Sequence, residues 1–180
     1  NEIVGKLTLA SQHDINDETS KSWVEEIETM REVLAPYEGR GSVYFEYNIP
    51  RMGRRVDVIA VIDGIIFVLE YKTAERKFSR EALVQVWDYA IDLKNFQEGS
   101  LERILIPILV VPSEKGTRCQ TDLKHFGDYV YEPLQVNTKR LAEAIEMVLS
   151  TVHYDVIPSQ TDAPWAKSGY SHTPAIIEAA

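Results

Sequence analysis

Two runs rich in β-branched residues, Arg55–Ile62 and Ile65–Lys72, are separated only by the dipeptide Asp63-Gly64. Asp-Gly is among the strongest local signals for a two-residue β-turn, because both central residues of such a turn need a positive φ. The sequence therefore predicts a tight hairpin. With this turn, the numbers of directly opposed residues sum to 127, so the position of the turn sets the whole register.

This register places Asp57 opposite Glu70, with Arg55 opposite Lys72 one step further from the turn on the same face. The rest of both strands is apolar on both faces and needs burial. Desolvation and mutual repulsion raise the pKa of neighbouring carboxyl groups, so their ionised forms require compensation. A hard divalent cation such as Mg²⁺ supplies it. The alternative is a surface lattice of ion pairs, in which Arg55 and Lys72 neutralise the acids.

The pattern around the hairpin predicts an α/β domain in the order α-β-β-β-α-β, with a further short strand and a last helix. The expected elements are a helix over Asp17–Leu34, a strand over Ser42–Asn48, a turn-rich connection over Ile49–Arg54, the two hairpin strands, a helix capped by Ser79 and running to about Phe96, a buried strand over Ile104–Val111, a strand within 128–136 and a helix over Thr138–Val152. We expect the first three strands to form an antiparallel meander.

Composition limits the classes of function. A chain of 180 residues with 44% hydrophobic residues suits one globular domain. One cysteine allows no internal disulfide, and four scattered histidines do not suggest a zinc site, so a reducing cytoplasm is the expected location. We expect no membrane span, because no apolar run approaches the required length of about 20 residues.

The formal charge of −9 argues against a surface that coats nucleic acid generally. Residues 51–80, however, carry +3 and the remainder −12, so a phosphate partner is expected to dock in this stretch. Arg51, Arg54 and Arg55 are the candidate contacts to a phosphate backbone, although arginines in a turn are often merely solvated.

Asp57, followed after a hairpin by Glu70-x-Lys72, resembles the motif of the PD-(D/E)XK nuclease superfamily. Val56 stands where the motif has proline. Gln85 and Tyr89 resemble the Gln-x-x-x-Tyr motif of the RecB-like branch; their spacing puts both on one helix face, where ordinary packing is the alternative role. The resemblance implies a restriction-endonuclease-like core, with a mixed central sheet flanked by helices and with Mg²⁺ or Mn²⁺ as cofactor.

A closer resemblance is to the N-terminal region of bacterial proteins with a Schlafen-group-3-type DNA/RNA helicase domain. It is carried by Phe45–Tyr47, Ile49–Asp57, Gln85–Phe96 and the tail from Trp165. It implies a nuclease-like domain over residues 1–152, then a linker over residues 153–180 that leads to a superfamily 1 helicase/ATPase region beyond Ala180. The chain itself contains no Gly-x-x-x-x-Gly-Lys-Ser/Thr phosphate-binding loop, and we expect it to be a piece of a longer protein.

The implied chemistry is hydrolysis of a phosphodiester. Asp57, Glu70 and the backbone carbonyl of Tyr71 would hold one or two metal ions, and Lys72 would orient the attacking water. Glu46, in the middle of an aromatic strand, is the candidate for a third acidic ligand.

Other roles remain open for several of these residues. Glu25 or Glu26 could replace Glu46 as the third ligand, and Glu46 could instead face solvent. Trp23 and Trp87 are expected in the core in preference to a base-stacking role.

Three functions follow from the sequence: an active nuclease, with DNA favoured over RNA as substrate; an inactive nucleic-acid-binding module that delivers substrate to the helicase; and a regulatory or assembly domain. Metal-dependent cleavage separates the first from the other two.

Overall fold

The computed structural model describes residues 17–50, 52–115, 123–152 and 165–170, with side chains described from Trp23 onward. The chain divides into two compact units, Asn1–Glu38 and Gly39–Ala180. The first contains helix α2, Asp17–Leu34, with the bounds that the sequence predicts, and a 3₁₀ turn at Ala35–Tyr37.

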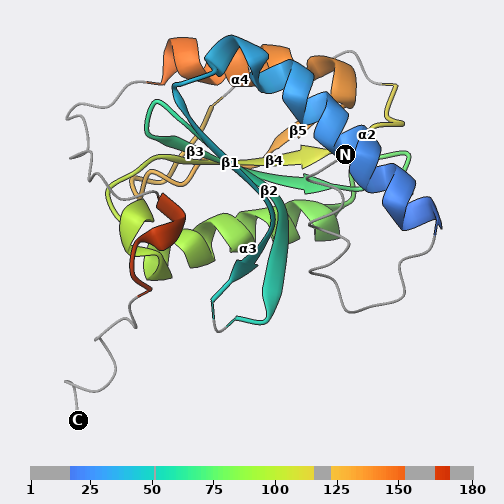
Figure 1. Ribbon diagram of the computed structural model, residues 1–180. Coiled ribbons are helices and arrows are strands. Elements are labelled where there is room, and N and C mark those ends of the chain that lie inside the picture. The colour runs from blue at the N-terminus through green and yellow to red at the C-terminus, as the bar shows by residue number, and fades with distance from the viewer. Residues whose placement is uncertain (1–16, 51, 116–122, 153–164, 171–180) are drawn as a thin grey trace. The chain divides into compact units, whose positions relative to one another are not determined.

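The second unit is an α/β domain built on one five-stranded sheet. Its elements are β1 (Gly41–Ile49), β2 (Arg54–Ile62), β3 (Ile65–Tyr71), α3 (Arg80–Phe96), β4 (Leu105–Val110), β5 (Leu134–Val136) and α4 (Leu141–Thr151). The strands follow one another across the sheet in chain order. The pairs β1–β2 and β2–β3 are antiparallel, whereas β3–β4 and β4–β5 are parallel, so the sheet is mixed. Helices α3 and α4 lie on opposite faces (Figure 1).

The Asp63-Gly64 turn forms as predicted. Both residues have a positive φ, 49° for Asp63 and 85° for Gly64, as a two-residue hairpin turn of this kind requires. The pairs from Ile62↔Ile65 to Val58↔Leu69 follow the predicted sum of 127. All of β3 is buried, because β2 and β4 flank it and both of its faces are covered.

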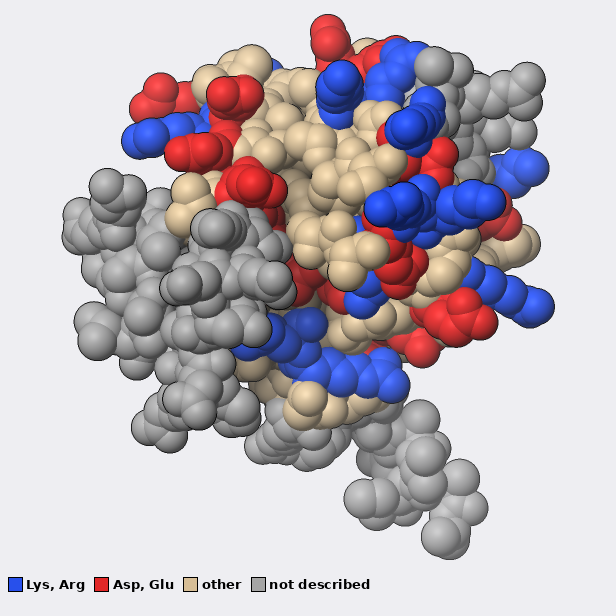
Figure 2. Space-filling model, turned by 90° about the vertical axis from the view of Figure 1, so that its right-hand side faces the viewer, with Lys and Arg blue, Asp and Glu red and all other residues tan. Residues whose placement is uncertain are grey.

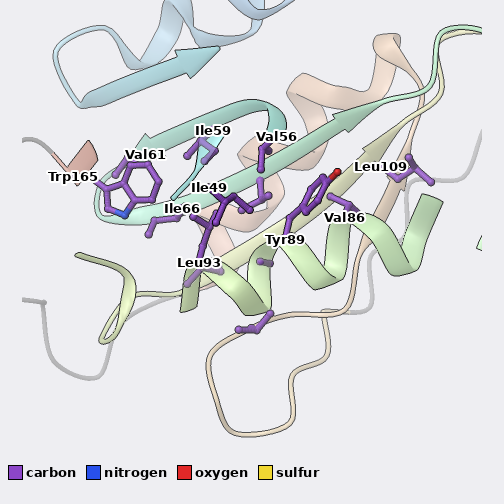
Figure 3. Packing of buried hydrophobic residues seen from close by; sticks show 14 of the residues in the cluster. Ile49, Val56, Ile59, Val61, Ile66, Val86, Tyr89, Leu93, Leu109 and Trp165 are labelled. Carbon is purple, nitrogen blue, oxygen red and sulfur yellow. The ribbon is translucent and has the colours of Figure 1, made fainter. Parts of the chain in front are cut away.

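The face of the hairpin that carries the candidate acids packs on α3. Ile59 and Val61 of β2, with Ile66 and Val68 of β3, share one buried cluster with apolar residues of α3. Figure 3 shows Val86, Tyr89 and Leu93 rising from α3 toward these strands. The helix begins where the sequence predicts, since the side chain of Ser79 accepts a hydrogen bond of 3.2 Å from the backbone N–H of Ala82. The residues that alternate with these on the two strands point to the other face of the sheet and are absent from this cluster, as expected from the pleat: Val58, Ala60, Ile62, Ile65, Phe67 and Leu69.

Part of the segment expected to be a linker is folded onto this unit. Trp165 is 4% exposed, and its indole N–H donates a hydrogen bond of 2.9 Å to the hydroxyl of Ser100. The side-chain amide of Gln97 donates to the backbone carbonyl oxygens of Trp165 and Ser168, each at 3.2 Å. Residues 153–164 and 171–180, also assigned to the linker, lie outside the described residues.

Among the described residues, no helix combines the length and the apolar character that crossing a bilayer requires.

The turn generates a test of the fold. Replacing Gly64 with alanine should lower the free energy of unfolding by about 1–2 kcal/mol, because a Cβ disfavours the left-handed backbone at this residue. Urea denaturation measures the change. Asp63→Asn is the matched control, since asparagine tolerates the same backbone conformation. It removes the ion pair between Asp63 and Arg40, which contributes little because it is exposed to solvent. Equal effects of the two substitutions would contradict this account of the hairpin.

Candidate active site

Strands β2 and β3 separate at the site. Their ladder ends at Val58↔Leu69, and beyond it β3 pairs only with β4, through Glu70↔Leu109 and Tyr71↔Val110. β2 is paired with β1 along its whole length, so at its start it keeps β1 as its one strand partner. Figure 1 shows the lower ends of β1 and β2 turning away from the rest of the sheet and passing α3. The antiparallel pairing of β2 and β3 therefore stops one residue short of Asp57 and Glu70.

The side chain of Asp57 occupies the point of separation. Its Oδ2 atom accepts a hydrogen bond of 2.8 Å from the backbone N–H of Tyr71, which would otherwise lose its partner on β2. The predicted strand pairs Asp57–Glu70 and Arg55–Lys72 are both absent, because the ladder has ended at Val58↔Leu69 and Arg55 pairs with Asn48 of β1. The side chains of Asp57 and Glu70 nevertheless interact. The role of the Tyr71 carbonyl as a metal ligand stays a prediction.

The carboxylate of Glu70 is held on one side and left open on the other. Its Oε1 atom accepts hydrogen bonds from the ammonium group of Lys72 at 2.8 Å and from the side-chain amide of Gln85 at 3.0 Å. The amide of Gln85 also donates to the hydroxyl of Tyr89 at 2.6 Å. The Glu70 side chain is 6% exposed. Its Oε2 atom is buried, and no hydrogen-bond donor from the described residues reaches it.

The carboxyl groups of Glu70 and Asp57 interact electrostatically and through a side-chain hydrogen bond, which requires one of the two to hold a proton. Burial, and then the charge of Asp57, raise the pKa of Glu70 to about 7, although Lys72 acts in the opposite direction. Burial also raises the pKa of Asp57, against the hydrogen bond from Tyr71 and the charges of Lys72 and Arg55. Burial opposes the charge on Lys72, but its hydrogen bond to Glu70 and the charges of both acids raise its pKa above the ordinary value. Ionising both Asp57 and Glu70 at the same time therefore costs free energy.

Glu46 lies next to this site in the register of the sheet. The pairs Phe45↔Val58 and Tyr47↔Val56 flank the position at which Glu46 would oppose Asp57. Glu46 has a φ of 52°, an uncommon conformation for a residue with a side chain. Its side chain is 12% exposed and forms an ion pair with Arg55 at 2.5 Å. Its role as a metal ligand stays a prediction.

The described residues contain no group of three or more histidine, cysteine, aspartate or glutamate side chains arranged to hold a metal. The acids Glu25 and Glu26 on α2 belong to the first unit. Glu26 is buried and Glu25 is exposed. Their proposed role as ligands stays untested.

An open cavity of about 290 Å³ adjoins Gln85 and Tyr89. The other lining residues are Arg54, Glu81, Val84 and Asp88. Arg54 forms ion pairs with Asp92 at 3.0 Å and with Asp88 at 4.0 Å, so it ties the start of β2 to α3. Arg51 lies outside the described residues. On the side of the molecule toward which β4 points, Lys and Arg side chains lie among Asp and Glu side chains (Figure 2).

The structure thus brings together Asp57, Glu70, Lys72, Gln85 and Tyr89, all of which the sequence had singled out. Sequence reasoning missed the two acids that form ion pairs with Arg54. Asp88 and Asp92 sit four residues apart on α3, and this spacing on one helix face was the available signal.

No protein-family model matches the chain, and no curated protein matches it either. The fold and the site define an α/β protein with a buried pair of carboxylates beside an ammonium group.

The pKa of Glu70 generates a prediction about pH. With EDTA present, the free energy of unfolding should fall as the pH rises from about 4.5 to about 7. The folded state binds the proton on Glu70 more tightly than the unfolded chain does, so raising the pH removes stability. The contribution should be on the order of 1–3 kcal/mol.

Urea denaturation at a series of pH values measures this contribution as the difference between the wild type and Glu70→Gln. Glu81→Gln, which changes an exposed glutamate on α3, is the control and should keep the wild-type slope. If Glu70→Gln also kept that slope, Glu70 would not be the group responsible.

Proposed function

We propose that this domain is a metal-dependent nuclease that hydrolyses phosphodiester bonds of nucleic acid at Asp57 and Glu70. The observation that carries the proposal is the buried Oε2 atom of Glu70, which has no donor among the described residues and lies on a carboxylate that interacts with Asp57. An orphaned carboxylate oxygen in a buried site costs free energy unless something compensates it. A divalent cation does so directly.

The residues present fit Mg²⁺ or Mn²⁺. Both ions prefer oxygen ligands, and Mg²⁺ is commonly held by one or two carboxylates with the remaining positions left to water and phosphate. Asp57 and Glu70 supply those carboxylates, and the Tyr71 carbonyl is the proposed neutral ligand. Glu46 becomes a further ligand if Arg55, exposed by 51%, leaves it for a phosphate. When bound, the cation supplies an activated water and stabilises charge on the phosphate oxygens.

The other side chains orient this centre. Lys72 keeps Glu70 in place through Oε1 and carries a positive charge that offsets the negative charge building on the phosphate in the transition state. Gln85 fixes the same oxygen, while Tyr89 holds the amide of Gln85. Water adds to phosphorus and gives up one proton to solvent as the bond to the leaving oxygen breaks, and that oxygen takes up one proton from solvent. Arg54 lies at the cavity beside these residues, where it can meet the flanking phosphate.

The strand order and the pairing of the sheet support a restriction-endonuclease-like core. On this proposal the domain is part of a larger protein that couples cleavage to a helicase/ATPase region, as the resemblance of the sequence implies. We propose DNA as the first substrate to test, with RNA beside it.

Metal binding and cleavage test the proposal together. Mn²⁺ should raise the melting temperature of the wild type and support cleavage of labelled single- or double-stranded substrates, and EDTA should abolish both effects. Asp57→Asn and Glu70→Gln should lose both, because each removes a charged ligand. These variants preserve side-chain volume, so their circular dichroism should match that of the wild type.

Two results would decide against the nuclease. Metal-independent binding of nucleic acid without any product would favour the module that delivers substrate. Cleavage that persists in both variants would place the active site elsewhere.

Lys72→Met should separate catalysis from metal binding. Removing the ammonium group while keeping an unbranched side chain should slow cleavage by roughly 100- to 1,000-fold, the loss expected for one transition-state donor. Stabilisation by Mn²⁺ should persist, since Lys72 is not a ligand. Lys139→Met, at an exposed lysine between β5 and α4, is the control. An unchanged rate in Lys72→Met would contradict the role given to this lysine.

A further inference from the structure

Exposed aromatic rings gather on the flank of α3 that faces away from Gln85 and Tyr89. Phe126 is 75% exposed and stacks on Trp87 of α3, with ring centroids 6.3 Å apart and planes at 21°. Trp87 is partly buried and packs against the core on its other side, so it joins the surface to the core. This packing confirms the expectation that Trp87 belongs to the core, and the contact with Phe126 places part of its ring at the surface.

The segment that carries Phe126 is held in a defined shape. The backbone N–H of Glu132 donates to the carbonyl oxygen of Lys124 at 2.8 Å, and His125 and Tyr131 form a β-bridge inside this pair. Gly127, with a φ of 96°, closes the bend and donates its N–H to Nδ1 of His125 at 3.1 Å. The rings are thus presented on an ordered backbone, which lowers the entropy cost of binding.

Further rings extend the surface. The His125 and Tyr129 rings are nearly parallel, with planes at 12° and centroids 6.1 Å apart. Tyr129 is 44% exposed, and the ammonium group of Lys94 lies 5.5 Å from the centre of its ring. Lys94 and Trp87 are seven residues apart on α3, so they lie on one stripe of the helix. The ammonium group of Lys94 also donates hydrogen bonds to the backbone carbonyl oxygens of Arg103 at 2.8 Å and Ser100 at 3.3 Å, so it is fixed beside the ring. Exposed aromatic faces are the features on which unpaired bases stack.

The surface is continuous with the candidate active site. Val84 lines the cavity beside Gln85 and Tyr89, is 47% exposed, and lies three residues before Trp87 on α3. Ile91, also exposed, continues the same apolar strip. A strand that leaves the cavity over Val84 would therefore meet Trp87 and Phe126 after crossing a single helix.

We propose that the rings of Trp87, Phe126 and Tyr129, with Lys94 beside them, form a stacking surface for the unpaired bases of a single-stranded nucleic acid. The proposal rests on the proposed function, because it assigns the strand that passes the catalytic residues. Duplex bases are already stacked on one another and cannot reach these rings. Stacking also explains how a chain with a charge of −9 could bind nucleic acid, since it depends little on accumulated positive charge.

Binding in EDTA tests the surface without requiring catalysis. Fluorescence anisotropy of labelled oligothymidylate and oligouridylate, against the matched duplexes, should show preference for the single strands. Phe126→Ala should weaken single-strand binding roughly tenfold, the cost of losing one stacked base. Phe126→Leu should weaken it similarly, whereas Phe126→Trp should retain it, because only an aromatic ring offers a face for stacking. Phe126 is largely exposed, so these variants should fold as the wild type does.

Val43→Ala is the matched control, since it shortens an exposed apolar side chain on β1, at the opposite edge of the sheet.

Bound oligothymidylate should also quench tryptophan fluorescence in the wild type, and most of that quenching should disappear in Trp87→Phe although binding remains.

Unchanged affinity in Phe126→Ala, or an equal loss in Val43→Ala, would overturn the stacking surface. A change in self-association or in binding of another protein, without a change in oligonucleotide affinity, would overturn it as well.

The two proposals can fail separately. Loss of binding in Phe126→Ala without any metal-dependent cleavage by the wild type would support the surface and reject the nuclease. Cleavage that needs Asp57, with oligonucleotide binding indifferent to Phe126, would support the nuclease and reject the surface.

Discussion

The site depends on the point at which β2 and β3 part. β3 pairs in an antiparallel manner with β2 at its beginning and keeps its parallel partner β4 to its end. Because β2 separates from β3 while it stays paired with β1, one backbone N–H of β3 loses its strand partner inside the protein. Asp57 satisfies that donor at Tyr71, and in doing so it places a carboxylate between the strands. A single hydrogen bond thus both completes the sheet and locates the acid that the proposed chemistry uses.

Burying two carboxyl groups together works against the stability of the fold. A sheet end filled with apolar side chains would avoid the desolvation that raises the pKa of both Asp57 and Glu70. The surrounding residues offset this cost only in part, since Lys72 and Gln85 both donate hydrogen bonds to the Oε1 atom of Glu70 and neither donates one to Oε2. Incomplete compensation of this kind is what a binding site for a cation requires, because a fully neutralised pair would have nothing to gain from one.

Helix α3 connects the two proposals. Its inner stripe packs on the sheet and fixes the position of the helix. One flank presents Gln85 and Tyr89 to the acids, and the other presents Trp87 and Lys94 to an aromatic segment nearly forty residues further along the chain. Both flanks are held by the same core, so the distance between the carboxylates and the rings is set by packing. The arrangement suits one extended ligand that touches both.

The sequence by itself determined the order of the elements, the Asp63-Gly64 turn and the hairpin register from Ile62↔Ile65 to Val58↔Leu69, which leaves Asp57 and Glu70 just beyond the last pair. These follow from local rules: turn chemistry, the pleat of a strand and the period of a helix. Only the tertiary structure decided where β2 separates from β3, so that Arg55 pairs with Glu46 and does not lie opposite Lys72. It also decided that Trp165 folds back onto the domain and that Phe126 meets Trp87. Such contacts depend on how the elements pack on one another, and they leave no periodic trace in the sequence.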